Sequence, residues 1–547
     1  IFYFMKIALA QLNYHIGNFE KNVFKIKNAI QKAKAKKADL IVFSELSVCG
    51  YPPKDLLEYP YFITQCEKAV SEIAKQCVGI AAIIGAPINN KNANEKKLFN
   101  AAIFLENGKV KSVHAKTLLP DYDVFDECRH FESNKNFEVV NFKKHKIAIT
   151  ICEDLWNEEN PLYSVNPMTE LKKLDPDFII NIAASPFSTS HAEIRKSVLT
   201  RTAKKHKLPL FYVNNIGAQT DLIFDGGSMV IDKNGKFFDE LIYFSEDFKI
   251  VELTTKGELK KTANSKNNFS KTEKIKKALV LGIRDYFEKN NFKTALIGLS
   301  GGIDSAVVLA LTCEALGEKN VFSVLMPSKF STNHSVADAL EMAKNIGCHH
   351  QIISIENTFD ALEKTMNPHF KKLPFNLAEE NMQARIRGII LMALSNKFGH
   401  ILLNTTNKSE MAVGYGTLYG DMCGALAVIG DLYKTQVYEL VKLINSEKKI
   451  IPKNIFLKAP SAELRHNQKD SDSLPDYDLL DKILFRYIEK KQSEKEITQA
   501  GFDATIVKKI LQLVNSNEYK RNQAPPVLRV SDKAFGSGRK MPIVGKY

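Results

Sequence analysis

Apolar and polar positions are arranged along the chain in a way that predicts strands and helices in turn. In the first half, short apolar runs typical of buried strands are separated by stretches in which apolar residues recur every three to four positions, the spacing of an amphipathic helix. The apolar runs are KIALAQL, DLIVFSE, IAAIIGAP, NAAIFLENG, KIAITIC, DFIINIAA and LPLFYVNN. Helical spacing is found at residues 18–36, 61–76 and 191–206. This order predicts an α/β domain built of layers.

A polar segment interrupts the pattern at about residues 252–274, and its low apolar content predicts a linker. The alternation then resumes, with the apolar runs TALIGLS, VFSVLMP and HILLN between expected helices at 304–316, 333–346 and 378–396. Strands separated by helices in this way are typical of a doubly wound parallel sheet. We therefore predict two domains, at residues 5–251 and 275–547, with a helical C-terminal extension on the second.

Length and composition are typical of a multidomain protein of the cytoplasm. The chain has 547 residues, of which 44% are hydrophobic, but no apolar run reaches the roughly 18–20 residues of a membrane span. No clear secretory signal is found, and we expect the four residues before Met5 to be an upstream extension. The eight cysteines are scattered without a CxxC pair, which argues against a zinc site and is typical of a reducing compartment.

The net charge of +14 raises the question of nucleic-acid binding. The lysines are spread over expected helix faces, as in KIKNAIQKAKAKK and KTEKIKKAL, and form no arginine-rich block with aromatic residues. This distribution favours solvated helix faces over an RNA surface. We therefore expect polyanionic small molecules, and neither nucleic acid nor a membrane, as partners.

Three chemically reactive side chains follow three expected strands. Cys152 ends KIAITIC, Glu45 ends DLIVFSE, and Lys116 ends the segment SVHAK. For an isolated cysteine, a small core residue is the usual explanation. A thiol, a carboxylate and an ammonium together are the groups that amide hydrolysis requires. In that chemistry Glu45 takes the thiol proton, Cys152 attacks the amide carbon, and Lys116 stabilises the oxyanion and lowers the thiol pKa.

These three segments together resemble the nitrilase superfamily, specifically its glutamine-amide hydrolase domains, over about Met5 to Lys249. The resemblance implies an α-β-β-α layered domain in which Glu127 is a second supporting carboxylate. It also implies that Tyr122 and Ser185 bind glutamine, together with His191, where many relatives have lysine. Three further residues near these motifs are weaker candidates for the site, because packing explains their presence as well as a functional role does. They are Tyr51, Glu153 and Trp156.

The segment LIGLSGGIDSAVVLAL, at 296–311, predicts a phosphate-binding turn between a strand and a helix. Backbone amides at such a turn bind anions, and glycines let the ligand approach closely. The turn lacks the Gly-Lys-Ser/Thr ending of a P-loop, and SGGIDS instead resembles the signature of ATP pyrophosphatases. That resemblance implies an adenine nucleotide α-hydrolase-like fold with the ATP-binding residues Ser300, Gly301, Gly302, Asp304 and Ser305. An acidic residue in a phosphate loop also predicts a divalent cation, Mg²⁺.

Five segments further along resemble NAD synthetases. They are EENMQARIRG, NTTNKSEMAVGYGTLYGDMCG, IGDLYKTQVYEL, PSAELRHNQKDSDSLPDYDLLD and NEYKRNQAPPVLRVSDKAFGSGRKMP. With the nitrilase-like half, nearly the whole chain resembles the glutamine-dependent NAD synthetases. This implies amidation of deamido-NAD through an acyl-adenylate, with ammonia made from glutamine and passed internally to the second site.

The resemblance also implies roles for individual residues of the second domain. Arg385 and Thr405 would contact ATP, while Asp304 and Glu410 would hold magnesium. The residues expected to bind deamido-NAD are Asn381, Glu410, Asp421, Lys434 and Lys520. Surface charge is the alternative explanation for Lys408, Lys434 and Lys520. Two mild departures from the family pattern are Thr406 and Val428.

Two other functions remain open on sequence alone. The SGGIDS loop also occurs in RNA-modifying enzymes such as tRNA-adenylating thiolases, and a nitrilase-like domain can be a scaffold with an inactive site. The first needs a second catalytic cysteine pair, and the intact Glu45, Lys116 and Cys152 set argues against the second. Since relatives assemble through the synthetase domain, we also expect a homo-oligomer.

Overall fold

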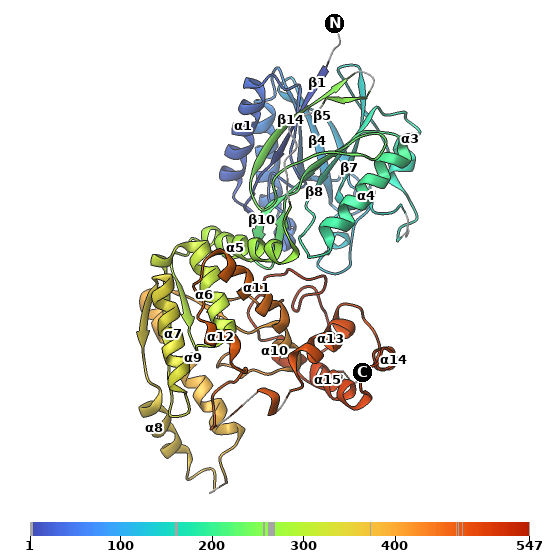
Figure 1. The fold of residues 1–547 in the computed structure, drawn as a ribbon. Coiled ribbons are helices and arrows are strands. Elements are labelled where there is room, and N and C mark those ends of the chain that lie inside the picture. Colours follow the sequence, from blue (N-terminus) through green and yellow to red (C-terminus); the bar gives the residue numbers. More distant parts are fainter. Residues whose placement is uncertain are drawn as a thin grey trace. The chain divides into compact units, whose positions relative to one another are not determined.

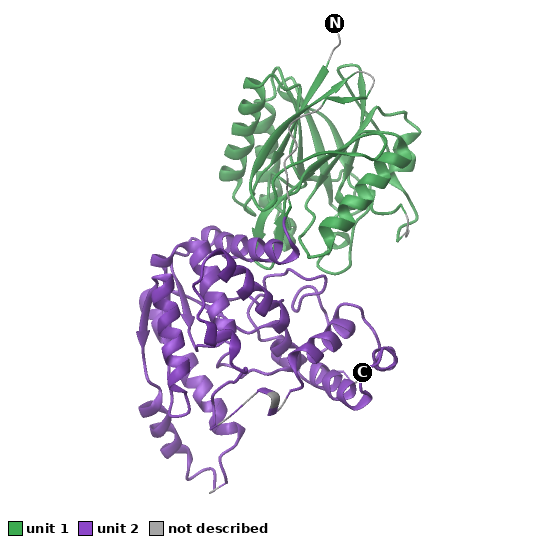
Figure 2. Ribbon diagram, viewed as in Figure 1, with its two compact units in different colours: residues 1–268 green, residues 269–547 purple. Residues whose placement is uncertain are grey.

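The computed structural model describes residues 4–158, 162–254, 257–260, 268–371, 373–466, 468, 470–472 and 474–545. They form two compact units that divide between residues 268 and 269 (Figure 2). Within the described residues, no helix is both long and apolar enough to span a membrane. Three of the four residues expected to be an upstream extension lie outside the described part, and Phe4 begins the first strand.

The first unit contains two stacked sheets. The larger has the order β15 (Leu259–Lys260), β14 (Asp247–Thr254), β1 (Phe4–Gln11), β2 (Leu40–Val42), β3 (Ala81–Asn89), β4 (Leu98–Glu106) and β5 (Lys109–Ala115). The smaller has the order β13 (Phe237–Glu240), β12 (Met229–Ile231), β9 (Leu210–Asn214), β8 (Phe178–Ala183), β7 (His145–Ile151) and β6 (Val140–Phe142). A separate hairpin pairs β10 (Ile216–Gln219) with β11 (Leu222–Asp225).

Helices cover the outer faces of both sheets (Figure 1). Against the larger sheet lie α1 (Phe19–Ala35) and α2 (Pro60–Ala74), and against the smaller lie α3 (Pro167–Lys172) and α4 (His191–His206). Alternate residues of β1 enter different cores: Ile7 packs between the sheets and Ala8 packs under the helices. Because both faces of these strands are buried, their sequences are continuous apolar runs. The α-β-β-α layers expected for this domain are therefore present.

The expected linker at 252–274 includes the ends of regular elements. β14 extends to Thr254 and pairs with β15, while α5 begins at Lys271. The polar composition of this segment conceals both strands, because β15 is a short edge strand and β14 beside it buries only alternate residues such as Val251 and Leu253. Residues 255–256 and 261–267 of the expected linker lie outside the described residues.

The second unit is built on a parallel sheet in the order β18 (His349–Ile352), β17 (Val321–Leu325), β16 (Ala295–Gly298), β19 (Ile401–Asn404) and β20 (Leu426–Ala427). The chain first adds strands on one side of β16 and then on the other, so the strand order reverses between β16 and β19. In sheets of this type, ligands bind at the carboxyl ends of the strands at that reversal. The SGGIDS loop follows β16 directly.

Helices surround this sheet and extend beyond it (Figure 1). Those in the sheet region are α5 (Lys271–Lys289), α6 (Ile303–Leu316), α7 (Asn333–Ile346), α8 (Glu356–Met366), α9 (Leu377–Phe398), α11 (Lys434–Glu447) and α12 (Lys453–Leu457). A further core is formed by α10 (Lys408–Val413), α13 (Tyr477–Ile488), α14 (Glu494–Gln499) and α15 (Ala504–Ser516), and the short α16 (Glu518–Arg521) follows. The doubly wound parallel sheet and the helical extension agree with the expected architecture.

Candidate active sites

The first site brings together side chains from the ends of strands in both sheets of the first unit. Glu45 lies beyond β2, Lys116 directly follows β5, and Cys152 directly follows β7. The Lys116 ammonium lies 2.8 Å from Glu45 Oε1 and 2.8 Å from each carboxylate oxygen of Glu127. All four side chains are buried. The structure therefore joins Lys116 to both predicted carboxylates, with Cys152 at a neighbouring strand end.

The backbone at Cys152 turns sharply. Its φ of +43° lies in the left-handed region, which is uncommon for a residue with a side chain. Asp154 holds this turn, because its carboxylate accepts hydrogen bonds from the N–H groups of Ile151 at 2.9 Å, Thr117 at 3.0 Å and Leu118 at 2.8 Å. Asp154 thus connects the turn at Cys152 to the segment that follows Lys116, a role that no motif in the sequence indicates.

Neutral hydrogen-bond donors fix both carboxylates. Asn100 Nδ2 donates to Glu45 Oε1 at 2.7 Å, and the backbone N–H of Ala184 donates to Glu45 Oε2 at 2.9 Å. The Tyr51 hydroxyl donates to Glu127 Oε1 at 2.9 Å, so this residue has a polar contact in addition to its packing. Asn100 was missed by sequence reasoning, because nothing in a strand sequence marks which buried amide faces a carboxylate.

Burial dominates the electrostatics of this site. Burial raises the pKa of the Cys152 thiol, the negative charge of Glu45 raises it further, and the ammonium of Lys116 lowers it by less. Lys116 lowers the thiol pKa, as expected, but desolvation of the thiolate outweighs this effect and the net pKa is raised. Burial also raises the pKa of Glu127 to about 7, against the opposing effect of Lys116. A neutral thiol needs a base to remove its proton.

The predicted glutamine-binding residues form two contacts beside this site. The Tyr122 hydroxyl donates to Glu153 Oε1 at 3.0 Å. The Ser185 hydroxyl lies 2.9 Å from Nε2 of His191, and the imidazole stacks on the ring of Trp156 at 5.0 Å between centroids. Burial raises the pKa of Glu153. Glu153 and Trp156, which packing could have explained, thus contact residues of the predicted subsite.

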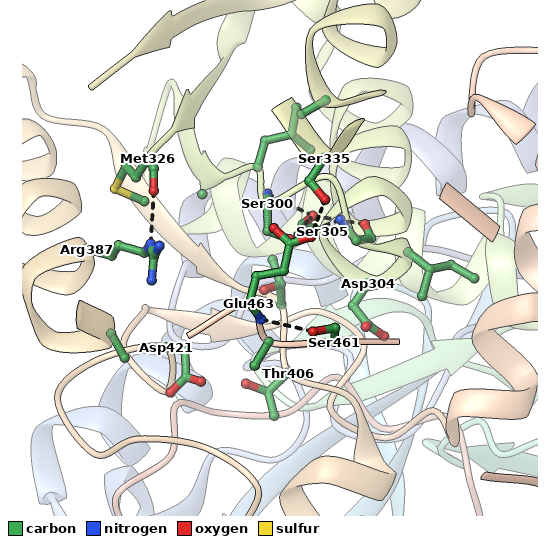
Figure 3. A pocket seen from close by; sticks show the side chains of 18 of the residues that line it. Ser300, Asp304, Ser305, Met326, Ser335, Arg387, Thr406, Asp421, Ser461 and Glu463 are labelled. Carbon is green, nitrogen blue, oxygen red and sulfur yellow. Dashed lines mark hydrogen bonds between the residues drawn. The ribbon is translucent and has the colours of Figure 1, made fainter. Parts of the chain in front are cut away.

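The second site surrounds the phosphate loop, Ser300–Ser305. Gly301 has a φ of +79°, and a Cβ on it would lie 2.2 Å from the carbonyl oxygen of Ser335, so only glycine fits. Gly302 N–H donates to the Ser300 hydroxyl at 3.1 Å, and the hydroxyls of Ser300 and Ser305 lie 3.1 Å apart. The loop faces a cavity of about 310 Å³ (Figure 3).

Most of the predicted ATP and deamido-NAD residues line this cavity. They are Ser300, Gly302, Asp304, Ser305, Thr405, Glu410, Asp421 and Lys434, and the departure Thr406 also lines it. Arg385 does not, because it is exposed and its Nε donates to the carbonyl of Leu418 at 3.3 Å. Arg387 lines the cavity instead and donates to the carbonyl of Met326 at 3.0 Å (Figure 3). Residues two positions apart in a helix are separated by about 200° around its axis, so Arg385 and Arg387 point to opposite sides of α9.

Asn381, Asp421 and Lys520 stabilise the loop at 414–421. Asn381 Oδ1 accepts a hydrogen bond from the Thr417 hydroxyl at 2.6 Å, and Asp421 Oδ1 accepts one from the Thr417 N–H at 2.5 Å. The Lys520 ammonium donates to the carbonyls of Gly414 at 2.8 Å and Gly416 at 2.9 Å. Asn381 and Lys520 lie outside the cavity lining described above.

Lys434 joins the two predicted metal ligands. Its ammonium forms an ion pair with Asp304 and lies 3.2 Å from Glu410 Oε1. Burial raises the pKa of Glu410 to about 8, while Lys434 lowers it. Asp470, which also lines the cavity, is a third carboxylate that acts on Lys434. Three carboxylates near one ammonium leave an excess of negative charge, and hard oxygen ligands of this kind suit Mg²⁺.

Lys408 is not a surface residue. Its side chain is fully buried, 2.9 Å from Asp431 Oδ1 and 2.8 Å from the Ser531 hydroxyl, and it also pairs with Glu489. Surface charge is therefore the wrong explanation for Lys408 and also for the buried Lys434. Lys408 instead connects α10 to the C-terminal segment. The departure Val428 is fully buried after β20.

A cover segment at 458–464 lines the cavity beside the phosphate loop. Its Glu463 carboxylate accepts a hydrogen bond from the hydroxyl of Ser335 at 2.6 Å (Figure 3). It accepts another from the hydroxyl of Thr332 at 3.0 Å. This segment carries one of the motifs shared with NAD synthetases, but sequence reasoning assigned no role to any residue in it. Glu463 places a negative charge close to the loop that is predicted to bind phosphate.

Both halves of the chain match known protein families. Residues 6–258 match the carbon-nitrogen hydrolase family, and residues 275–524 match the NAD synthase family. An amide-hydrolysing domain followed by an ATP-dependent synthetase domain defines a two-domain ligase that uses glutamine as nitrogen donor.

Whole-chain comparisons identify the family more closely. The chain is 48% identical over 550 residues to the glutamine-dependent NAD(+) synthetase of Synechocystis sp., covering 99% of each chain. It is 40% identical over 544 residues to that of Acinetobacter baylyi, covering 99% of this chain and 98% of the relative. The chain belongs to the glutamine-dependent NAD(+) synthetases, and not to the RNA-modifying enzymes considered above.

Solved structures agree with this assignment. The glutamine-dependent NAD+ synthetase from Acinetobacter baumannii in complex with adenosine diphosphate superimposes with a TM-score of 0.79 at 39% identity, covering 99% of each chain. The structure from Cytophaga hutchinsonii superimposes with a TM-score of 0.84 at 21% identity, which shows the common fold. The predicted fold and enzyme class are confirmed.

Proposed function

We propose that glutamine is hydrolysed by Glu45, Lys116 and Cys152, with Glu127 in support. Glu45 removes the proton of the neutral thiol, and the Cys152 sulfur attacks the amide carbon. Glu45 then returns this proton to the nitrogen, the C–N bond breaks, and ammonia leaves a thioester on Cys152. Water hydrolyses the thioester, which releases glutamate and restores the thiol. The Lys116 ammonium stabilises the negative charge that develops on the amide oxygen. The single observation that carries this proposal is the Lys116 ammonium, fully buried and 2.8 Å from both carboxylates beside the strained Cys152 turn.

The nicotinate carboxylate of deamido-NAD is activated at the second site. Its attack on the α-phosphate of ATP forms an acyl-adenylate and releases pyrophosphate, and ammonia then displaces AMP to give the amide. The N–H groups and hydroxyls of the phosphate loop bind the leaving pyrophosphate. Arg387 and Lys434 line the same cavity and supply positive charge for the phosphates.

Magnesium fits the carboxylates of this cavity. Asp304 and Glu410 are the residues that would hold it, as predicted, and Asp470 is close enough to affect the charge at Glu410. When bound, Mg²⁺ neutralises negative charge on the phosphates of ATP. Lys434, which pairs with both Asp304 and Glu410, would then be available to the substrate.

Ammonia made at the first site passes internally to the acyl-adenylate. In neutral solution nearly all ammonia is ammonium, which has no lone pair for attack. A route that excludes water keeps NH₃ unprotonated. This chemistry explains why a glutaminase domain precedes the synthetase domain on one chain.

Replacing the nucleophile tests this division of labour. Cys152→Ala is expected to lower glutamine-dependent NAD formation on the order of 10³-fold, because no covalent intermediate can form. NAD formation from ammonium should stay within about twofold of the native rate, since the second site is unchanged. Both rates are measured with deamido-NAD, ATP and Mg²⁺. Full glutamine use by the variant would overturn the assignment of Cys152.

The chain forms a homo-oligomer through the synthetase domain. The support for this proposal is α9, which exposes Ile389, Met392 and Phe398 to solvent with 67%, 39% and 63% of their areas accessible. Ile389 and Met392 are three positions apart and lie on one face of the helix. A second copy of the chain packing on this face would bury them.

A further inference from the structure

Two consecutive asparagines lie beside the first site and take no direct part in the proposed chemistry. Asn214 ends β9, and Asn215 follows it. Both side chains are buried, with 0% and 4% of their areas accessible. β9 runs parallel to β8, and Asn214 is in register with Ala183. The asparagines therefore lie next to the segment Ala183–Ser185, which continues β8.

Asn214 clamps the backbone of Ser185. Its Oδ1 accepts a hydrogen bond from the Ser185 N–H at 2.9 Å, and its Nδ2 donates to the Ser185 carbonyl at 3.3 Å and to the Gly226 carbonyl at 2.9 Å. Asp225 accepts a weaker bond from the same amide at 3.4 Å and is held by a bidentate ion pair with Arg195, at 3.0 and 2.9 Å. The amide is thus fixed on both sides.

Asn215 connects the same segment to the base. Its N–H donates to the Ala183 carbonyl at 3.1 Å, and its Oδ1 accepts a hydrogen bond from the hydroxyl of Ser44, the neighbour of Glu45. Ala184 N–H donates to Glu45 Oε2 at 2.9 Å. Asn215 therefore acts on both sides of Glu45. Its side chain holds Ser44, which precedes Glu45, and its backbone holds Ala183, which precedes the donor Ala184.

We propose that Asn214 and Asn215 are positioning residues, which hold the general base Glu45 and the glutamine subsite at Ser185 in the correct relative positions. Asn215 acts on Glu45 through Ser44, and Asn214 acts on substrate binding through Ser185. This inference rests on the proposed roles of Glu45 and Ser185. Proton removal from the thiol depends steeply on geometry, because a displacement of about 1 Å costs on the order of 100-fold in rate.

The test measures kcat and KM for glutamine hydrolysis in the full-length protein. Ser44→Ala and Asn215→Ala are each expected to lower kcat about tenfold with KM within about twofold, because Glu45 loses its orientation but the subsite does not. Asn214→Ser is expected to raise KM about tenfold or more, because the Ser185 backbone is released. If Ser44 and Asn215 act through each other, the double variant Ser44→Ala/Asn215→Ala has the kcat of either single variant.

Controls separate this role from simple destabilisation. Thr202→Val removes another buried hydroxyl, which donates only to the Val198 carbonyl of its own helix at 3.0 Å, and should leave kcat and KM unchanged. NAD formation from ammonium should be normal in all variants. Alkylation of the buried Cys49, Cys66 and Cys77 reports whether the first unit is folded, since these thiols are protected in the native fold.

Each outcome separates the positioning role from the proposed catalytic site. Folded Ser44→Ala and Asn215→Ala proteins with native kcat would overturn the positioning role, as would additive effects in the double variant. If Thr202→Val lowers kcat as much as Ser44→Ala does, the loss of any buried hydroxyl has the same effect and the positioning role is overturned. If Cys152→Ala still hydrolyses glutamine, the proposed catalytic site itself is wrong.

Discussion

Cys152 shows how burial sets the chemistry of a single residue. Its thiol pKa is raised although a lysine lies nearby, because the loss of hydration destabilises the thiolate more than the Lys116 charge stabilises it. The proposed mechanism therefore depends on Glu45 as a base rather than on a preformed thiolate. Glu127 completes the cluster by holding the Lys116 ammonium through both of its oxygens.

The raised pKa of Glu127 predicts a pH dependence. Burial brings this pKa to about 7, so the carboxylate takes up a proton as the pH falls through that value. Lys116 then loses one of the two anions that hold it, and kcat/KM for glutamine should fall. Glu127→Gln mimics the protonated state and should be at least about tenfold less active at pH 8, without a step near pH 7.

Initial rates of glutamate release between pH 5.5 and 9 measure this profile. Glu132→Gln removes a more exposed carboxylate near the same strand ends and serves as the matched control, with a native profile expected. A step near pH 7 that persists in Glu127→Gln would show that another group controls the rate.

At the scale of elements, the starts of α6 and α7 together form the proposed phosphate site. The phosphate loop, Ser300–Ser305, runs into the first turn of α6, and Gly301 contacts the backbone of Ser335 in α7 so closely that no side chain fits between them. The cover segment then joins the same region through Glu463. The cavity is thus lined by three segments that are far apart in sequence, namely the phosphate loop, the start of α7 and the cover segment.

Gly301→Ala is expected to abolish the ATP-dependent step with either nitrogen source. Its Cβ would lie 2.2 Å from the Ser335 carbonyl oxygen, so the loop must move, and kcat should fall at least about 100-fold. Gly347→Ala is the control, because this glycine ends α7 with φ +83° and an added Cβ would meet no atom within 4 Å. It should cost about 1–2 kcal/mol of stability and leave kcat intact. Equal kcat losses in the two variants would contradict this account.

Glu463→Gln tests the charge of the cover segment. Removing a carboxylate beside the phosphate loop should lower KM for ATP about threefold to tenfold, since one unfavourable charge contact is worth about 1 kcal/mol. Asp472 lies near the same segment but outside the cavity lining. Asp472→Asn should therefore leave KM for ATP unchanged. An unchanged or raised KM in Glu463→Gln would show that the carboxylate does not oppose phosphate binding.

At the scale of the whole molecule, two catalytic units are combined on one chain. Each has its own cores, and the polar segment expected to join them includes an edge strand of the first unit. The family assignment rests on both units, because the matches to relatives cover nearly the full chain.

The proposed assembly through α9 is tested on the whole molecule. Ile389→Glu places a charge on the exposed apolar face of α9 and should lower the particle mass measured by light scattering to that of a smaller species. Phe24→Glu, at a residue of α1 that is 64% exposed in the other unit, is the matched control and should leave the mass unchanged. An oligomer that resists Ile389→Glu would exclude this face as the interface.

The sequence by itself determined the two folds, the phosphate loop and most of the proposed catalytic residues. These features are written in contiguous stretches, since apolar spacing is local and reactive residues follow strand ends within short motifs. Tertiary structure decided the contacts between segments far apart in sequence. It selected Arg387 over Arg385 for the cavity, and it brought Asn100, Asp154 and the Asn214–Asn215 pair to the first site. It also set the net pKa of Cys152, because burial and distance are properties of packing and not of residue type.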